Sequence, residues 1–186
     1  MFATAALNLQ VRVARHSDIP ALNQLIRQSV RGLLSEDYTP QQIESSLVHL
    51  FGVDTHLIDD GTYYVAEVEG CLAGAGGWSR RAAIYGHDST PGHEAAATLL
   101  NPLTDAARIR AYFVHPDFAR RGIARELLYL SEAAARAEGF WKLELVATWK
   151  GAPVYRACGF EATGEASVKL PDGVTLTGLY MRKILY

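Results

Sequence analysis

The residues with the clearest chemical pattern lie in the segment 111–125, which reads AYFVHPDFARRGIAR. An apolar, extended run ends at Val114, the turn-forming triplet 115–117 (HPD) follows, and a helix is expected to begin at Gly122. The first N–H groups of a helix have no acceptor within the helix, and the helix dipole adds positive potential there. Gly122 lets an anion approach the backbone, and arginines surround it. The segment therefore predicts an anion site, with a diphosphate as the expected ligand.

The common nucleotide-binding motifs do not account for this segment. It contains neither the GxxxxGK[ST] of a P-loop nor the GxGxxG of a dinucleotide-binding fold. Taken alone, it is also compatible with a helix start that has a solvated basic face. A second segment is needed to decide between these interpretations.

That second segment covers residues 151–160, GAPVYRACGF. A short helix is expected over 152–157, because Pro153 suits a first turn and Gly159 suits a helix end. Three residues separate Tyr155 from the Gly159-Phe160 pair, and a strand is expected to begin at Phe160.

Together the two segments resemble the GNAT superfamily of acetyl-coenzyme A-dependent N-acetyltransferases. The family's acetyl-CoA motif follows a strand, often after Val-His-Pro, as Gln or Arg, two residues, Gly, one residue, and Gly or Ala. This chain has VHP at 114–116 and ARRGIA at 119–124, and it has the family's later Tyr-x-x-x-Gly-Phe pattern at Tyr155. Ala119 departs from the motif, which leaves one side-chain contact to phosphate in doubt, although the neighbouring arginines could compensate. The resemblance covers roughly residues 10–185.

The resemblance implies that acetyl-CoA is the co-substrate and that two groups of residues bind it. The backbone of the strand end would bind the pantetheine arm, through Tyr112, Phe113 and Val114. The helix start would bind the diphosphate, through Arg120, Arg121, Gly122, Ile123, Ala124 and Arg125.

The resemblance also implies that an amine attacks the thioester directly in a ternary complex, so that proximity supplies much of the rate. The Val114 amide would stabilise the carbonyl oxygen. Tyr155 stands where the family has its general acid; a phenol has a pKa of about 10 and a thiol about 8.5, so donation requires good placement. A core tyrosine is the alternative. Glu144 is a candidate general base acting through water, or else an exposed strand carboxylate.

The acceptor site is expected near the glycine-rich strand 71–79 and the long irregular stretch 80–104. Candidate substrate-binding residues are Trp78, Arg80 and Tyr85, with plain surface residues as the alternative. His56, His87 and His93 lack metal-ligand spacing with any cysteine or carboxylate cluster, so no metal is expected.

The remaining pattern predicts a single α/β (α+β) domain over residues 1–186, with a GNAT-like mixed sheet of about seven strands flanked by about four helices. Expected strands are 10–15, 62–68, 71–79, 108–114, 142–147, 160–170 and 174–184. Expected helices begin after Ser17 as N-cap, after Thr39 as N-cap, at Gly122 and at Ala152, with a helical turn around 94–100.

Composition limits the classes of function. The chain has 186 residues, 49% hydrophobic and 20% charged, which is typical of a soluble globular protein rather than a disordered chain. Its net charge of −2 gives no positive field for nucleic acid, and no run is long enough to span a membrane. Without a signal-peptide pattern, and with Cys71 and Cys158 as two thiols, a cytoplasmic location is expected.

Three alternatives remain open at this point. The first is a non-catalytic acyl-CoA-binding sensor on the same fold, which Tyr155 argues against. The second is an enzyme with a macromolecular acceptor, either a protein N-terminus or a tRNA. A tRNA would favour a basic surface, which this chain lacks, and a small-molecule or peptide amine is expected. The third is a homodimer in which the terminal hairpin 160–184 pairs between chains, and it is compatible with catalysis.

Overall fold

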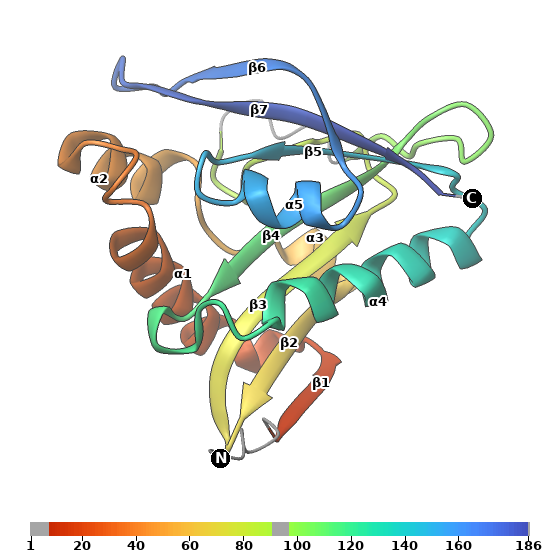
Figure 1. The fold of residues 1–186 in the computed structure, drawn as a ribbon, viewed down its shortest axis with the longest axis horizontal. Helices are drawn as coiled ribbons and strands as arrows, with labels where there is room; N and C mark the ends of the chain where they lie inside the picture. The colour runs from red at the N-terminus through yellow and green to blue at the C-terminus, as the bar shows by residue number, and fades with distance from the viewer. Residues whose placement is uncertain (1–7, 91–96, 186) are drawn as a thin grey trace, which may run out of the picture.

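The computed structural model describes residues 8–90 and 97–185. Its seven strands form one mixed sheet, as the sequence predicted, and their order in the sheet is β1-β2-β3-β4-β5-β7-β6 (Figure 1). All neighbouring strands are antiparallel except β4 and β5, which are parallel. The strands are β1 (Leu9–Val13), β2 (Tyr63–Val68), β3 (Cys71–Ser79), β4 (Ala107–Val114), β5 (Lys142–Ala147), β6 (Glu161–Lys169) and β7 (Thr175–Ile184).

Helices cover both faces of this sheet. Within the described ranges they are α1 (Ile19–Leu33), α2 (Pro40–His49), α3 (Thr55–Asp59), α4 (Ile123–Ala137) and α5 (Ala152–Ala157). In Figure 1, α4 and α5 lie on the near side of the sheet. The core residues of α1 and α2 join Tyr63 and Val65 on one face, whereas Ala66 of the same strand packs with α4. This alternation along β2 shows why the sheet has a core on each side.

Of the two predicted N-cap residues, Thr39 and Ser17, the structure confirms the first. Thr39 caps α2 through a complete capping box with Gln42, as its position before Pro40 predicted. Ser17 was wrong as the cap of α1. It lies inside a 3-10 turn (His16–Asp18), and Asp18 occupies the cap position while accepting the Arg15 N–H at 2.7 Å.

One helix was missed by the sequence analysis. Helix α3 has five residues, too few to show an apolar period. Asp54 caps it by accepting the His56 N–H at 3.0 Å. Of the expected helical turn around 94–100, residues 94–96 lie outside the described residues, and Leu99 forms an isolated antiparallel bridge with Arg81.

The sheet splits between its two parallel strands. The pairing of β4 with β5 is limited to Ala107 with Leu143 and Arg108 with Glu144. Beyond that point Ala111 has a positive φ of 57°, an unusual conformation for a residue other than glycine. The register between β3 and β4 also shifts at this level. The strand ends therefore diverge and leave the edge of β4 facing an opening.

No helix in the part of the chain that the structure describes has the length and apolar character needed to cross a membrane.

Candidate active site

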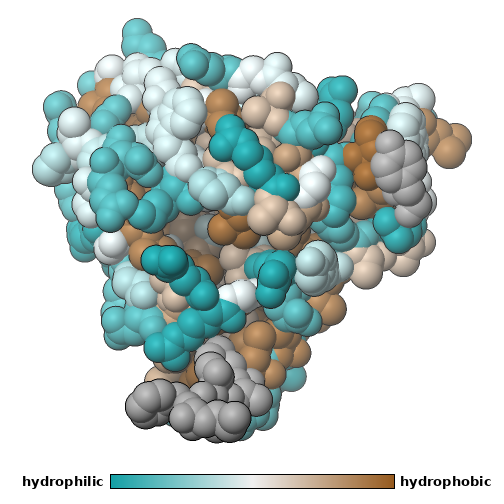
Figure 2. Space-filling model, viewed as in Figure 1, coloured by the Kyte–Doolittle hydropathy of each residue, from teal (hydrophilic) through white to brown (hydrophobic). Residues whose placement is uncertain are grey.

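A cavity of about 520 Å³ fills the opening between β4 and β5. Its walls include 109–114 of β4 and 146–148 around the end of β5. Residues from α1 line it on one face of the sheet, and residues from α4 and α5 line it on the other, so the cavity passes through the sheet. Figure 2 shows a hollow on this face, with hydrophobic residues in its depth and hydrophilic ones along its rim.

The start of α4 forms one part of the wall. Gly122 is the N-cap residue with a φ of 85°, and the N–H groups of the first helical turn that follow it have no intrahelical acceptor. Arg120 and Arg125 line the cavity, and neither has an ion-pair partner among the described residues. Arg121 points elsewhere, because its guanidinium lies over the Phe118 ring, 5.4 Å from the centroid. Two of the three predicted arginines therefore reach this wall.

The open edge of β4 presents backbone groups to the cavity. The His115 N–H bonds to Ala73 of β3 at 2.9 Å, so the alternating pattern of a strand turns the Val114 N–H toward the opening. There it donates to the side-chain oxygen of Ser29 on α1 at 3.2 Å. Ser29 is buried and lines the cavity, and sequence reasoning had not selected it. Its only sequence signal is a small polar residue on the apolar stripe of α1.

The side chains of Tyr112 and Phe113 each pack against another side chain. The Tyr112 hydroxyl is 2.8 Å from the Ser131 hydroxyl of α4, and burial raises the pKa of that phenol well above its usual range. Phe113 packs edge-on against Phe51, with ring centroids 5.9 Å apart. Both residues also line the cavity.

Tyr155 of α5 lies in the cavity wall beside this edge. Its ring packs edge-on against Tyr112, with centroids 6.1 Å apart, and against Phe160 at 5.8 Å. Burial raises the pKa of the Tyr155 phenol above its usual value, because the charged phenolate would lose hydration. The side chain therefore stays protonated at neutral pH.

The sequence model of the Acetyltransferase (GNAT) family matches residues 27–160, which include the cavity-lining parts of α1, β4, α4, β5 and α5. This chain belongs to the GNAT acetyltransferase family. No curated protein matches its sequence.

Solved GNAT structures share this fold at low sequence identity. A GCN5-related N-acetyltransferase from Rhodopseudomonas palustris has a TM-score of 0.69 at 20% identity, covering 100% of this chain and 99% of that one. The PaiA N-acetyltransferase of Thermoplasma acidophilum, solved with coenzyme A, has a TM-score of 0.63 at 13% identity, covering 96% and 99%. A ribosomal-protein-alanine N-acetyltransferase from Brucella melitensis has a TM-score of 0.60 at 21% identity, covering 95% and 99%.

Glu144, the candidate base, does not line the cavity of this GNAT protein. It lies where β4 and β5 still pair, opposite Arg108, before the strands diverge. One carboxylate oxygen contacts Arg108, and the other accepts from Arg182 at 2.6 Å. These two arginines hold the carboxylate away from the opening.

The three candidate acceptor residues divide between two places. Trp78 is almost completely buried against Phe140, and Arg80 pairs with Glu138 at 2.9 Å on the α4 face, so neither lines the cavity. Tyr85 does line it and is partly exposed. The β3 strand alternates its side chains between faces, which is why Trp78 points into the core beneath α4.

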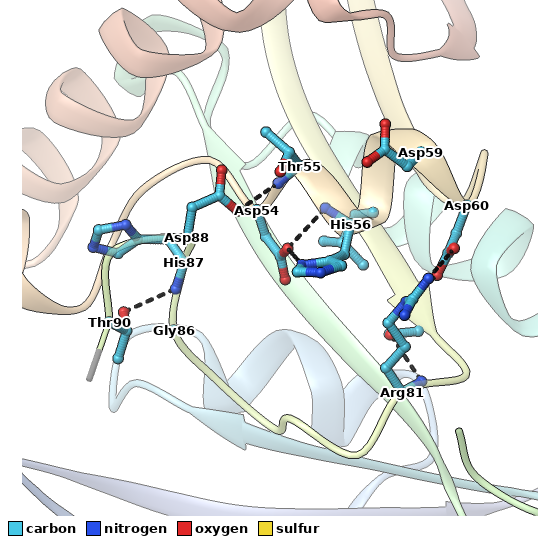
Figure 3. Close-up of polar contacts among 12 residues, drawn as sticks. Asp54, Thr55, His56, Asp59, Asp60, Arg81, Gly86, His87, Asp88 and Thr90 are labelled. Atoms are coloured by element: carbon cyan, nitrogen blue, oxygen red, sulfur yellow. Dashed lines mark hydrogen bonds and ion pairs between the residues drawn. The ribbon is translucent and has the colours of Figure 1, made fainter. Parts of the chain in front are cut away.

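A buried ion pair anchors the chain around Tyr85. The Arg110 guanidinium of β4 lies 2.7 Å from the Asp54 carboxylate and donates to the Gly86 carbonyl at 2.9 Å. Burial lowers the pKa of Arg110, and the adjacent carboxylate opposes that shift. Figure 3 shows the neighbouring contacts: Asp88 accepts the Thr55 N–H at 2.9 Å, and Arg81 bonds to Asp60 at 2.7 Å. These contacts fix the segment 81–90 against α3.

The spacing argument against any histidine–carboxylate cluster was wrong. Asp54, His56 and Asp88 bring ligand atoms within 4.8 Å of one another, because α3 packs beside the segment 81–90 (Figure 3). Their carboxylates already have partners, however: Arg110 lies against Asp54, and Asp88 accepts the Thr55 N–H. The Arg110 guanidinium therefore supplies a positive charge next to the Asp54 carboxylate. His93 lies outside the described residues.

Proposed function

We propose that this protein is an acetyl-CoA-dependent N-acetyltransferase that moves an acetyl group to a primary amine of a small molecule or peptide by direct attack in a ternary complex. The observation that carries the proposal is the cavity between β4 and β5, which combines the N-terminus of α4 with a protonated tyrosine. The family match supports the same reaction class.

The helix start suits the diphosphate of the co-substrate. Gly122 has no side chain to fill the position, and the Ile123, Ala124 and Arg125 amides are those that a helix leaves without acceptors. Arg120 and Arg125 add unpaired positive charge at the same wall. The Tyr112 N–H on the open edge of β4 would bind the pantetheine arm as an added strand does, since the Val114 N–H is already donated to Ser29.

Ser29 would stabilise the thioester carbonyl. A serine hydroxyl has one donor and two acceptor positions, and Ser29 uses an acceptor position for the Val114 N–H. Its own proton is left to donate into the cavity. The amide polarises the hydroxyl and strengthens that donation, so the Val114 amide acts on the carbonyl oxygen through Ser29.

Tyr155 would then act as the general acid. The neutral amine attacks the carbonyl carbon, a C–N bond forms, and the C–S bond breaks with its electron pair on sulfur. Tyr155 donates its phenolic proton to that sulfur, and the nitrogen loses its extra proton to solvent. Solvent returns a proton to Tyr155, so the products are coenzyme A and the N-acetyl amine.

Calorimetric titration with acetyl-CoA tests the proposal first. Arg125→Glu reverses charge at the first turn of α4, and Arg136→Glu makes the same change in its last turn, away from the cavity. A carboxylate near a helix start favours the helix, so lost binding in Arg125→Glu would not come from a weaker helix. We expect Arg125→Glu to weaken acetyl-CoA binding at least about tenfold and Arg136→Glu to leave it unchanged.

Turnover is then measured as thiol release with a panel of primary amines. Release that depends on both acetyl-CoA and an amine supports the transferase. Tight acetyl-CoA binding without release from any amine would indicate a non-catalytic acyl-CoA sensor instead. Equal binding by the wild type and both variants would remove the assigned diphosphate site.

A further inference from the structure

The side of the cavity that faces α1 and α2 has apolar walls. We call this the acceptor side. It is lined by Val30, Leu33, Leu34, Leu50, Phe51, Ile84 and Tyr85, together with the Arg110 stem on β4. An acceptor bound here exchanges water for aliphatic and aromatic contacts, so an apolar body gains free energy on entry.

The charged side chains that line the cavity, over the described residues, are all cationic: Arg110, Arg120, Arg125 and Lys150. Arg110 pairs with Asp54, and Lys150 contacts Glu36. A protonated amine on this side would lose its hydration and would find no carboxylate to pair with among the described lining residues. Its neutral form is therefore strongly favoured.

The same lining shapes the proton chemistry of the acceptor. Glu144 is held by two arginines outside the cavity, and the lining residues within 8–90 and 97–185 include no carboxylate or imidazole to deprotonate an ammonium. An amine that arrives neutral needs no such base. An α-amino group has a pKa of about 8 and a lysine-type amine about 10.4, so their neutral fractions at pH 7 differ by roughly 100-fold.

From this charge distribution we infer that the acceptor is the α-amino group of an amino-acid derivative or peptide with an apolar first side chain, and not an alkylammonium such as a lysine side chain or a polyamine. This inference rests on the proposed function. The apolar side chain would pack against Leu33 and Phe51, and the low pKa of the amine would deliver it uncharged.

The test compares three primary amines in the acetyl-CoA assay: leucine amide, isopentylamine and cadaverine. Leucine amide and isopentylamine share an apolar body and differ in the carboxamide that lowers the amine pKa. At pH 7 we expect kcat/KM for leucine amide to exceed that for isopentylamine at least about tenfold, with cadaverine poorer still. From pH 7 to 9 the isopentylamine value should rise about 100-fold with its neutral fraction, whereas that for leucine amide levels off.

A pair of variants tests the charge argument directly. Leu33→Glu adds a carboxylate to the acceptor side, and Leu33→Gln adds the same bulk without charge. We compare kcat/KM for cadaverine with kcat/KM for leucine amide in each variant. We expect this ratio to be at least about fivefold higher in Leu33→Glu than in Leu33→Gln. Ile84→Glu and Ile84→Gln provide a second pair if the first fails to fold, as checked by thermal melting.

The outcomes separate this inference from the proposed function. Preference for isopentylamine or cadaverine at pH 7 would overturn the inference and leave the transferase intact. Acetylation of none of the three, with thiol release from another amine of the panel, would overturn the inference alone, whereas acetyl-CoA binding without release from any amine would overturn both. Equal ratios in folded Glu and Gln variants would remove the charge argument and the inference with it.

Discussion

The Ser29 hydroxyl oxygen accepts a 3.2 Å hydrogen bond from the backbone N–H of Val114, linking α1 to the open edge of β4. Ser29 is buried within the apolar stripe of α1, where a polar atom is stable only with such a partner. The bond leaves the hydroxyl proton directed to other acceptors, and the cavity lies beside it. A side chain from the first helix thereby becomes part of the candidate catalytic apparatus.

Replacing Ser29 by Ala tests this role. We expect kcat to fall roughly 10- to 100-fold, because one donor to the developing oxyanion is lost, while coenzyme A affinity stays within about twofold. The infrared band of the isotopically labelled thioester carbonyl should shift toward its position in water. Ser46→Ala, which removes another buried helical hydroxyl, should alter stability but not that band. An unchanged band in a folded Ser29→Ala would limit Ser29 to a structural role.

Tyr155→Phe should lower kcat by roughly 100-fold and leave acetyl-CoA binding intact, because only the proton donor is removed. Burial raises the pKa of Tyr155, which favours the protonated form, so the wild-type kcat should show no loss from phenol ionisation up to about pH 10. Pre-steady-state thiol release across this pH range measures both effects. Tyr38→Phe removes another buried phenol oxygen, one that donates to the Thr177 carbonyl at 2.7 Å, and serves as the control. Equal kcat values for Tyr155→Phe and wild type would show that solvent, and not Tyr155, protonates the departing sulfur.

Glu144→Gln should keep kcat within about twofold and reduce stability by about 1 kcal/mol, since the carboxylate joins Arg108 and Arg182 instead of facing the cavity. Denaturant unfolding and the pH profile of kcat/KM give the two readouts. A large drop in kcat with loss of the acidic limb of the profile would instead support the base role suggested by its place in the sequence.

Asp60 should make stability depend on acid pH. Its carboxylate accepts two hydrogen bonds from Arg81 at 2.7 Å, and these lower its pKa from the ordinary value of 3.8. A lowered folded-state pKa stabilises the protein fully above pH 3.8, and this contribution is lost as pH falls through the folded-state value. Melting temperatures between pH 2 and about 7 should show a shallower acid slope for Asp60→Asn than for wild type. The control variant Asp37→Asn, at an exposed site, should retain the wild-type slope. Parallel slopes for Asp60→Asn and wild type would show that the Asp60–Arg81 ion pair does not contribute to the pH dependence of stability.

Local sequence determined most of the elements and the start of α4. The segment 111–125 is sufficient to place a strand, a turn and a helix start, because each signal acts between residues a few positions apart. The same holds for the Thr39 cap of α2 and for α5, which was predicted over 152–157 and has these limits in the structure. Short α3 fell below the length at which periodicity is visible.

Tertiary structure decided which side chains meet at the cavity. Ser29 and Val114 are 85 positions apart, and Asp54 and Arg110 approach only because α3 packs beside the sheet. The side-chain types of three predicted site residues suited their roles, yet these residues do not line the cavity: Trp78, Arg80 and Glu144. Strand alternation and the short pairing of β4 with β5 place their side chains outside it. Which face a strand residue takes, and where two strands separate, depend on packing between distant segments, and no pattern within a single segment encodes that.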